Sequence, residues 1–351
     1  MNYTSRFTLA LVAAAALTLA LPCKSAPLPF TGVNISGGEF GGSPKPGERL
    51  AYNVKYTYPK PAEIDYFASK GMNIIRFPFH WEALQPEPLK SLDAVDLARF
   101  KAVVDYATSK GLTVLLDPHN SARYYGQIVG GPDVSTDVFA DFWSRMSLEF
   151  KDNSRVWFGL TNEPNSMPND VWLADANAAI AAIRKTGAKN RILVAGNGYS
   201  AACDWMGNGN DVVMLGVKDP KNNWIFEPHA YLDEDNSGTH KTVVSATIGV
   251  ERLTAFTEWC RKHKFRALLG EFAVPEHPLG RDAIDNMVGY MEKNRDVWVG
   301  FTWWSAGPWW GNYMFSIEPK DGIDKPQLAY LAGHLQPTLG DKSRENGSNP
   351  R

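Results

Sequence analysis

Short apolar runs alternate with amphipathic patterns along most of the chain. The runs are rich in β-branched and aromatic residues and have the length of buried strands. Eight of them occur, at Phe30–Ser36, Met72–Phe79, Leu112–His119, Val156–Glu163, Arg191–Gly196, Trp224–Tyr231, Arg266–Phe272 and Val297–Ser305.

Between most of these runs, apolar residues recur every three or four positions. Leu97, Phe100 and Val104 follow this spacing, and Gly111 ends the pattern, which predicts a helix. Further helices are predicted around Ile64–Lys70, Asp137–Phe150, Val171–Thr186, Thr247–His263 and Ala283–Asn294. Eight strands interleaved with helices predict an α/β fold with a parallel sheet, and eight strands close into a single (β/α)8 TIM barrel. A doubly wound open sheet is the alternative.

The first residues have the pattern of a sorting signal. Arg6 precedes the uncharged apolar run Phe7–Leu21, which is too short to span a bilayer comfortably. Residues 1–25 are therefore predicted to be a signal peptide, and the protein is expected to be secreted. Cleavage after Ala20, Ser25 or Ala26 remains open, as does a periplasmic or lipid-anchored form, since a cysteine follows the run.

No linker or internal repeat divides the rest of the chain. Residues 26–340 are predicted to form one (β/α)8 domain, and the polar residues 341–351 a disordered tail. If Cys23 leaves with the signal, only Cys203 and Cys260 remain. Stability must then come from a hydrophobic core, whether or not these two cysteines pair.

The charge balance excludes some classes of partner. A net charge of −2 and a pI near 6.4 provide no bulk basic field, so neither nucleic acid nor, after processing, a membrane is expected as a partner. A monomer is expected. Aromatic residues stand out instead, because the chain holds 12 tryptophans. Five of them come late, at Trp298, Trp303, Trp304, Trp309 and Trp310.

Polar and aromatic side chains collect where the predicted strands end. They are Arg76, His119, Asn120, Asn162, Glu163, His229, Tyr231, Glu271 and Trp304. In a barrel these ends open on one face, where active sites are built. Glu163 ends the fourth strand and Glu271 the seventh, so both carboxylates are expected to approach one cavity. Two such carboxyl groups can cleave a sugar acetal, one as an acid and one facing the anomeric carbon.

Each residue also has a structural explanation. A single glutamate at a strand end is usually solvated, and a lone histidine such as His119 or His229 is usually a satisfied core residue. Arg76 is less ambiguous, because a guanidinium in an apolar run must meet a carboxylate. Tryptophans belong to the core by default, but the pair Trp309 and Trp310 lies in a predicted loop between Pro308 and Gly311.

Three motifs imitate cofactor or metal sites. Gly196–Ala201 resembles a dinucleotide fingerprint, but the segment before Val212 has no room for a crossover helix. Asp233–Gly238 resembles the start of a calcium loop, yet Val244 stands where a bidentate glutamate is required. The histidines show no zinc-ligand spacing. No cofactor and no metal are therefore expected.

Several longer motifs resemble glycoside hydrolase family 5, the retaining cellulase family, from about Phe30 to Gln336. They are Gly-Val-Asn-Ile-Ser-Gly at 32–37, Arg-Phe-Pro-Phe at 76–79, Asn-Glu-Pro at 162–164, His-Ala-Tyr-Leu-Asp-Glu-Asp-Asn-Ser-Gly-Thr-His at 229–240, Gly-Glu-Phe at 270–272 and Trp-Trp-Ser-Ala-Gly-Pro-Trp-Trp-Gly-Asn-Tyr at 303–313. The histidine and tryptophan motifs are the most specific. Within this family, the chain is especially similar to secreted endo-β-1,4-glucanases of fungi and some bacteria.

The resemblance implies roles for the residues at the strand ends. Glu163 would be the acid/base and Glu271 the nucleophile. Asn162 would bind the sugar 2-hydroxyl, while Arg76 and Tyr231 would hold Glu271 charged and oriented. A nearby arginine favours an anionic nucleophile, whereas an acid keeps its proton best in a less cationic, partly apolar setting.

The remaining candidates would contact the substrate. His119 and His229 would bind sugar or tune the two glutamates, Asn120 is a further substrate-binding candidate, and Trp304 would stack beneath the sugar. Outer sugar platforms are expected from Trp205, Trp309 and Trp310.

The implied substrate is a β-glucan polysaccharide or oligosaccharide. Related sequences hydrolyse mannan, xyloglucan or mixed-linkage glucan, and these substrates stay open. A non-catalytic sugar-binding barrel would have lost one of the two glutamates, and both are present. Fungal members often carry several disulfides, whereas this chain has one at most, and it shows no carbohydrate-binding module. Action on soluble or amorphous glucan is expected.

Overall fold

The computed structural model describes residues 26–337. The expected signal peptide and polar tail lie outside these residues. Within them, no helix combines the length and the apolar character needed to cross a membrane. Cys203 is exposed, Cys260 is buried, and both are free thiols.

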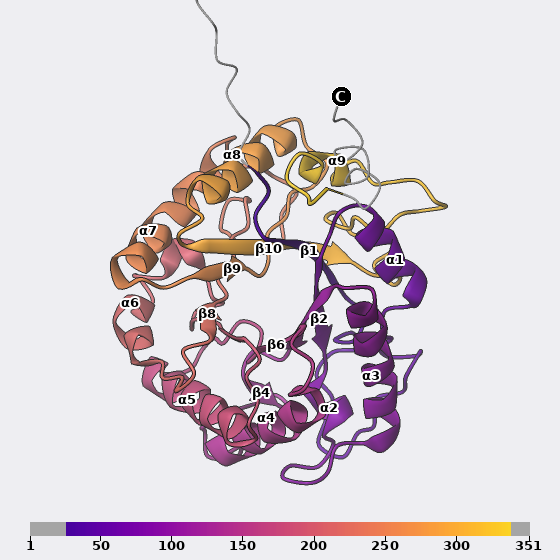
Figure 1. Ribbon diagram of the computed structural model, residues 1–351, viewed down its shortest axis with the longest axis vertical. Helices are drawn as coiled ribbons and strands as arrows, with labels where there is room; N and C mark the ends of the chain where they lie inside the picture. Colours follow the sequence, from indigo (N-terminus) through magenta and orange to yellow (C-terminus); the bar gives the residue numbers. More distant parts are fainter. Residues whose placement is uncertain (1–25, 338–351) are drawn as a thin grey trace, which may run out of the picture.

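Eight parallel strands close into a barrel in the order β1-β10-β9-β8-β7-β6-β3-β2 (Figure 1). The pair β1 and β10 completes the ring, with Val33 opposite Trp303. The predicted (β/α)8 barrel is thereby confirmed, and the open sheet is excluded. The strands are β1 (Phe30–Ile35), β2 (Ile74–Phe79), β3 (Thr113–Pro118), β6 (Val156–Gly159), β7 (Ile192–Val194), β8 (Trp224–Phe226), β9 (Ala267–Leu269) and β10 (Trp298–Ala306).

Helices surround the barrel on the outside (Figure 1). All six predicted helices are present. After the fifth strand, where the sequence predicts no room for a crossover helix, the chain forms only a four-residue helix and two 3-10 turns. The hairpin β4–β5 and the short helices α2 and α9 were not predicted. The elements are α1 (Pro61–Ser69), α2 (Trp81–Leu84), α3 (Ala94–Ser109), β4 (Arg123–Tyr124), β5 (Gln127–Ile128), α4 (Thr136–Phe150), α5 (Asn169–Lys185), η1 (Ala202–Asp204), α6 (Asn210–Val213), η2 (Met214–Gly216), α7 (Ile248–His263), α8 (Gly280–Lys293) and α9 (Leu328–Leu331).

The core has two layers. A small inner cluster fills the barrel, and a larger one lies between strands and helices. Trp143, Trp172 and Trp298 belong to the outer layer, where their indole N–H groups donate to Leu160 O, Ala195 O and Thr257 Oγ1. Buried tryptophans with satisfied N–H groups fit the default expectation of a packed core. The inner cluster consists of Ile74, Leu115, Trp157, Leu193, Ile225, Leu268 and Val299.

The strands that lead to the expected catalytic residues are shorter than predicted. β6 ends at Gly159, four residues before Glu163, and β9 ends at Leu269. Isolated bridges extend the pairing, since Ala201 pairs with His229 and His229 pairs with Glu271. The site residues therefore sit on short extended segments just beyond the sheet, and Glu163 adopts a positive φ of 40°.

A buried ion pair fixes the loops around the fifth strand. The guanidinium of Arg184, at the end of α5, binds both carboxylate oxygens of Asp219 at 2.7 and 2.8 Å. It also donates to the backbone carbonyls of Ala188 and Asn190. The two side chains are 4% and 0% exposed, so neither charge has access to water.

Substitution of one partner tests this role in stability. Asp219→Ala would leave Arg184 buried and unpaired, which should cost about 3–5 kcal/mol of unfolding free energy. Asp296→Ala is the matched control, because its pair with Arg261 is exposed and should contribute about 1 kcal/mol or less. Urea unfolding measures both. Equal losses in the two variants would contradict the assignment.

Candidate active site

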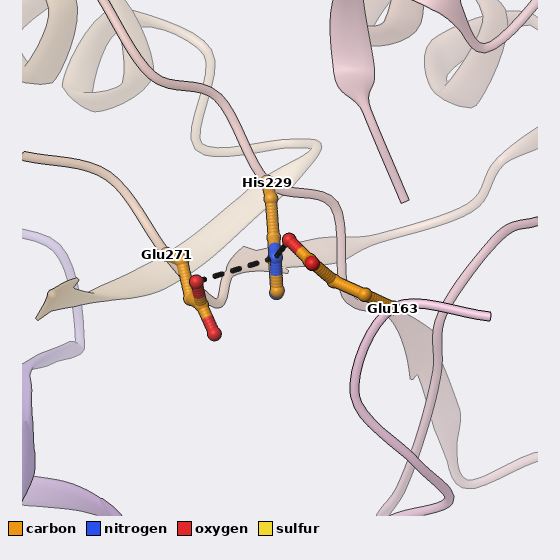
Figure 2. A group of neighbouring side chains, drawn as sticks. All are labelled: Glu163, His229 and Glu271. Atoms are coloured by element: carbon orange, nitrogen blue, oxygen red, sulfur yellow. Dashed lines mark hydrogen bonds and ion pairs between the residues drawn. The ribbon is translucent and has the colours of Figure 1, made fainter. Parts of the chain in front are cut away.

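Two glutamates and a histidine form the centre of the site (Figure 2). His229 Nδ1 lies 2.7 Å from Glu163 Oε1 and 3.7 Å from Glu271 Oε2. One oxygen of each carboxylate and a ring nitrogen of His229 all lie within 4.8 Å of one another. Glu163 and Glu271 thus approach one cavity, as their places after the fourth and seventh strands predict.

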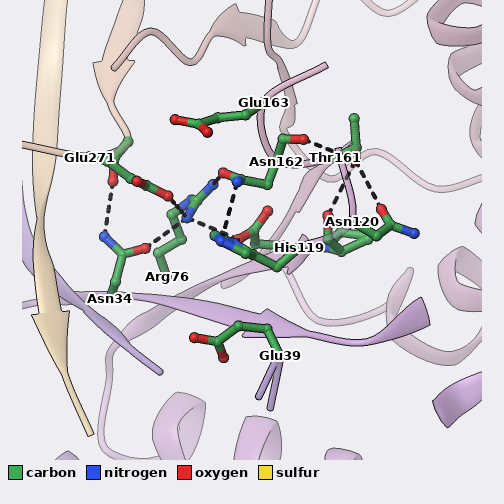
Figure 3. Close-up of polar contacts among 12 residues, drawn as sticks. Asn34, Glu39, Arg76, His119, Asn120, Thr161, Asn162, Glu163 and Glu271 are labelled. Atoms are coloured by element: carbon green, nitrogen blue, oxygen red, sulfur yellow. Dashed lines mark hydrogen bonds and ion pairs between the residues drawn. The ribbon is translucent and has the colours of Figure 1, made fainter. Parts of the chain in front are cut away.

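Arg76 on β2 is the most connected charged residue beneath this pair. Its side chain is 0% exposed and contacts three carboxylates. Burial alone would lower the pKa of Arg76, but the surrounding carboxylates raise it, so the guanidinium stays charged. Figure 3 shows Arg76 between Asn34, Asn162 and Glu271. The partners are Asp117 Oδ2 at 2.9 Å, Glu227 Oε1 at 2.6 Å, Glu271 Oε1 at 2.9 Å, Asn34 Oδ1 at 2.8 Å and Asn162 Oδ1 at 2.7 Å.

Three of these partners were not assigned from the sequence. Asn34, Asp117 and Glu227 are all buried and lie on or just after β1, β3 and β8. The available signal is the same anomaly that marked Arg76, a charged residue inside an apolar run. Asp117 follows Leu115 and Leu116, and Glu227 follows Ile225 and Phe226. A buried acid in such a run needs a cationic or hydrogen-bonding partner, just as a buried arginine needs a carboxylate. The two acids could therefore have been recognised as candidate partners of Arg76.

Glu271 is held on both oxygens. Its Oε1 accepts from Arg76, and its Oε2 accepts from the Tyr231 hydroxyl at 2.6 Å. Burial, and then the charge of Glu271, raise the pKa of Tyr231 far above its usual value, so the phenol remains a donor. The preceding Gly270 is required here, because a Cβ would lie 2.6 Å from Glu227 Oε1.

Asn162 connects Arg76 to the neighbouring histidine. Its Oδ1 accepts from Arg76, and its Nδ2 lies 3.2 Å from His119 Nε2. The other ring nitrogen of His119 contacts Asp117 Oδ2 at 2.8 Å, which fits a neutral ring that donates from Nδ1 and accepts at Nε2. The side chain of Asn162 is therefore fixed before any substrate binds.

His229 is the polar partner of Glu163. Burial alone would lower the pKa of His229, but Glu271 and the hydrogen bond to Glu163 raise it to about 10. His229 Nδ1 and Glu163 Oε1 share one hydrogen bond, in which the group that holds the proton donates. His229 stands between the two acids, so it contacts Glu163 directly and lies 3.7 Å from Glu271.

The same three side chains have the donor set of a metal site. Here His229 Nδ1 and Glu163 Oε1 are 2.7 Å apart and hydrogen-bond to each other, so two of the three possible ligands already satisfy one another. Asp233, Asp235 and His240 form a second such group. There, Asp233 Oδ2 accepts the backbone N–H groups of Thr239 and His240, which closes the loop in the manner of a turn. Neither geometry favours a metal.

Aromatic residues line one side of the catalytic pair. Trp304 stacks on His119 with ring centroids 5.1 Å apart and an interplanar angle of 12°. Trp310 stacks on Tyr313 at 4.2 Å, and the neighbouring Trp309 is 39% exposed. These tryptophans line a hollow of about 550 Å³ together with His119, as sugar platforms would.

Trp205 does not join them. Its side chain is 0% exposed and packs against Phe226, Phe256 and Trp259 in the outer core. The prediction of a platform at Trp205 was wrong, because η1 turns this residue inward. The exposed aromatic residue nearby is Tyr199, which is 57% exposed and was not singled out from the sequence.

A second hollow, of about 760 Å³, shares no lining residue with the first. Glu163, His229 and Tyr231 line it together with Tyr199. Glu163 therefore borders this hollow, whereas His119 borders the aromatic one. One is mainly aromatic, and the other is lined by more polar side chains.

Asn120 has a different place from the one expected. Its side-chain oxygen accepts from the Thr161 hydroxyl at 3.1 Å, and its amide donates to the Arg123 carbonyl. Both ends of the amide are therefore engaged by the protein. Asn120 joins the loops after β3 and β6, and through Thr161 it positions the neighbouring Asn162 rather than presenting a free amide to substrate.

Comparison with known proteins agrees with this site. The family model described as cellulase (glycosyl hydrolase family 5) matches residues 30–307. Endo-beta-1,4-glucanase B of Aspergillus niger is 40% identical over 322 residues, which cover 90% of this chain and 94% of the relative.

Solved structures share the fold at similar coverage. XacCel5A in complex with cellopentaose is 45% identical with a TM-score of 0.85, over 88% of this chain and 99% of the other. The Pseudomonas stutzeri endoglucanase Cel5A in complex with cellobiose is 33% identical with a TM-score of 0.81, over 90% and 94%. The barrel, the paired glutamates and these matches together assign the chain: it belongs to the cellulases of glycosyl hydrolase family 5.

Proposed function

We propose that the chain is a secreted, monomeric endo-β-1,4-glucanase that hydrolyses internal bonds of β-glucan with retention of configuration. The observation that carries this proposal is the separation of Glu163 and Glu271, whose nearest oxygens lie within 4.8 Å. Retaining glycosidases hold their carboxyl groups about 5 Å apart, whereas inverting enzymes leave room for a water molecule. The endoglucanase relatives support the substrate class.

An internal cut requires space for sugar on both sides of the reacting bond. Two separate hollows lie at the site, one lined by Trp304 and Trp309 and the other by Glu163 and Tyr199. Flat aromatic rings pack on the C–H faces of pyranoses. A glucan chain can therefore extend past the glutamates in both directions, which favours an endo cut over removal of terminal units.

In the first step, Glu271 attacks the anomeric carbon while Glu163 gives its proton to the leaving glycosidic oxygen. The bond to the leaving sugar breaks as the glycosyl ester forms. Arg76 and Tyr231 hold Glu271 on both oxygens, so the attacking carboxylate loses little freedom in the transition state. Glu163 is less enclosed, with 21% of its side chain exposed, and can reach both the leaving group and, later, water.

In the second step, Glu163 takes a proton from water, which attacks the anomeric carbon and releases Glu271. Between the two steps, Glu271 is a neutral ester. The charge that most raises the pKa of His229 is then absent. His229 therefore binds its proton less tightly in the intermediate, and the ring links the charge of one glutamate to its contact with the other.

Substrate preference is tested with soluble polysaccharides. The purified protein should lower the viscosity of carboxymethylcellulose rapidly while it releases few reducing ends, because an endo cut shortens chains from within. β-Mannan should be cleaved more slowly. Faster cleavage of mannan, or reducing ends released without loss of viscosity, would contradict the proposal.

The two glutamates are separated by an aryl cellobioside whose phenol leaves readily. Glu163→Ala should still show a burst of phenol, since little protonation is needed, and should then stall because the base is missing. Azide, which needs no base, should restore turnover as the β-glycosyl azide. Glu271→Ala should show no burst with any leaving group, and azide can yield only the α-product.

If Glu271→Ala instead gave the burst and the β-azide, Glu271 would be the acid/base and Glu163 the nucleophile. Losses below about tenfold in both variants would place the site elsewhere, because a catalytic nucleophile contributes far more than that. Glu251→Ala is the control, since this glutamate is exposed on α7 and should leave turnover unchanged.

NMR of the histidine ring tests the link between His229 and Glu271. In the wild type His229 should titrate near pH 10, and Glu271→Gln should move its pKa down toward the ordinary value of 6.5. A raised pKa stabilises the fold fully below pH 6.5 and ceases to do so as pH rises through about 10. Glu251→Gln should change neither the pKa of His229 nor the pH dependence of stability. An unchanged His229 titration in Glu271→Gln would contradict the link.

A further inference from the structure

A third hollow lies at the end of the barrel opposite the catalytic residues. The catalytic glutamates follow the carboxyl ends of the parallel strands, whereas this hollow is lined by segments that lead into β1, β6, β7, β8 and β9. Its volume is about 770 Å³, and its floor includes Trp157 and Val299 from the inner core. We call it the N-terminal mouth.

Cationic side chains dominate this mouth. Lys151, Lys189, Arg191 and Arg266 line it, and the single acidic residue among its lining is the exposed Asp152. In the part of the chain that the structure describes, none of the four cations lies within ion-pair distance of a carboxylate. Two other arginines differ, since Arg184 binds Asp219 and Arg261 binds Asp296.

Arg191 is held in place without an anion. Its guanidinium lies over the Trp157 ring, 4.7 Å from the centroid, and its Nε donates to Asn223 Oδ1 at 3.3 Å. Burial, and then the charge of Arg266, lower the pKa of Arg191. Two guanidinium groups therefore repel each other across a confined space, one of them fixed against the barrel floor.

Four uncompensated cations around one hollow are unfavourable on their own and favourable for an anion. The net charge of the chain is −2, so the cluster is a local feature and not part of a basic surface. We propose that the N-terminal mouth binds a small polyanion, a ligand that carries two or more phosphate or carboxylate groups. Its volume lies within the range of small-ligand sites, whereas nucleic acid requires an extended basic stripe.

This site is independent of the glucanase activity. Its lining shares no residue with the two hollows beside Glu163 and Glu271. A polyanion should therefore bind without competing with β-glucan, and binding can be measured whether or not the proposed function holds.

Isothermal titration calorimetry with the whole protein tests the proposal. The probes are tripolyphosphate and a trimer of galacturonate, and neutral maltotriose is the comparison. At low ionic strength at least one polyanion should bind, with affinity that falls as salt is added. Binding of tripolyphosphate alone would assign a phosphate ligand, and binding of the galacturonate trimer would assign an acidic sugar. Absence of binding by both polyanions would overturn the proposal.

Charge reversal locates the site. The double variant Lys189→Glu with Arg266→Glu changes two exposed side chains and should weaken binding by about tenfold or more, since the ligand would face two new negative charges. Lys90→Glu makes the same kind of change in the exposed loop before α3, at the other end of the barrel, and should leave binding unchanged.

Milder variants keep the test independent of folding. Lys189→Gln with Arg266→Gln removes the charges without reversing them and should weaken binding less than the reversal does. Arg266→Lys should retain most of the affinity. Equal binding by the wild type and both double variants, or equal weakening by Lys90→Glu, would show that the polyanion does not occupy the N-terminal mouth.

Discussion

The buried guanidinium of Arg76 is the interaction on which the catalytic face depends. It lies on β2 and contacts residues that belong to or follow β1, β3, β6, β8 and β9. Three carboxylates cannot be buried side by side without a cation, because the desolvation of each is costly. Arg76 offsets part of that cost and at the same time fixes where Glu271 and Asn162 point. The same contacts of Arg76 therefore neutralise the buried carboxylates and orient the residues of the site.

The two glutamates differ in how firmly the protein holds them. Glu271 is bound on both oxygens by Arg76 and Tyr231, and its side chain is 4% exposed. Glu163 has its one side-chain hydrogen bond with His229. A nucleophile benefits from a fixed geometry, whereas an acid that later becomes a base must reach a leaving oxygen and then a water molecule. The asymmetry of support matches the proposed division of roles.

The two ends of the barrel treat charge in opposite ways. At the catalytic end, Arg76 is surrounded by Asp117, Glu227 and Glu271. At the N-terminal mouth, Arg191 and Arg266 have hydrogen bonds but no carboxylate. Because the same strands pass through both ends, the barrel can carry a balanced reaction centre and an unbalanced cationic hollow that do not share residues.

The order of strands and helices was predictable because apolar periodicity is a local property of the sequence. It placed Glu163 and Glu271 after their strands, and the carboxyl ends of a parallel barrel meet by construction. Local sequence patterns do not determine whether a side chain in a loop faces the core or the solvent. Trp205 faces the core and Trp309 faces solvent, although both lie in loops rich in glycine or proline. That Arg76 needs a carboxylate followed from its apolar neighbours. Tertiary packing decided that Arg76 has three carboxylate partners and that His229 stands between the two acids. These partners come from strands far apart in the chain.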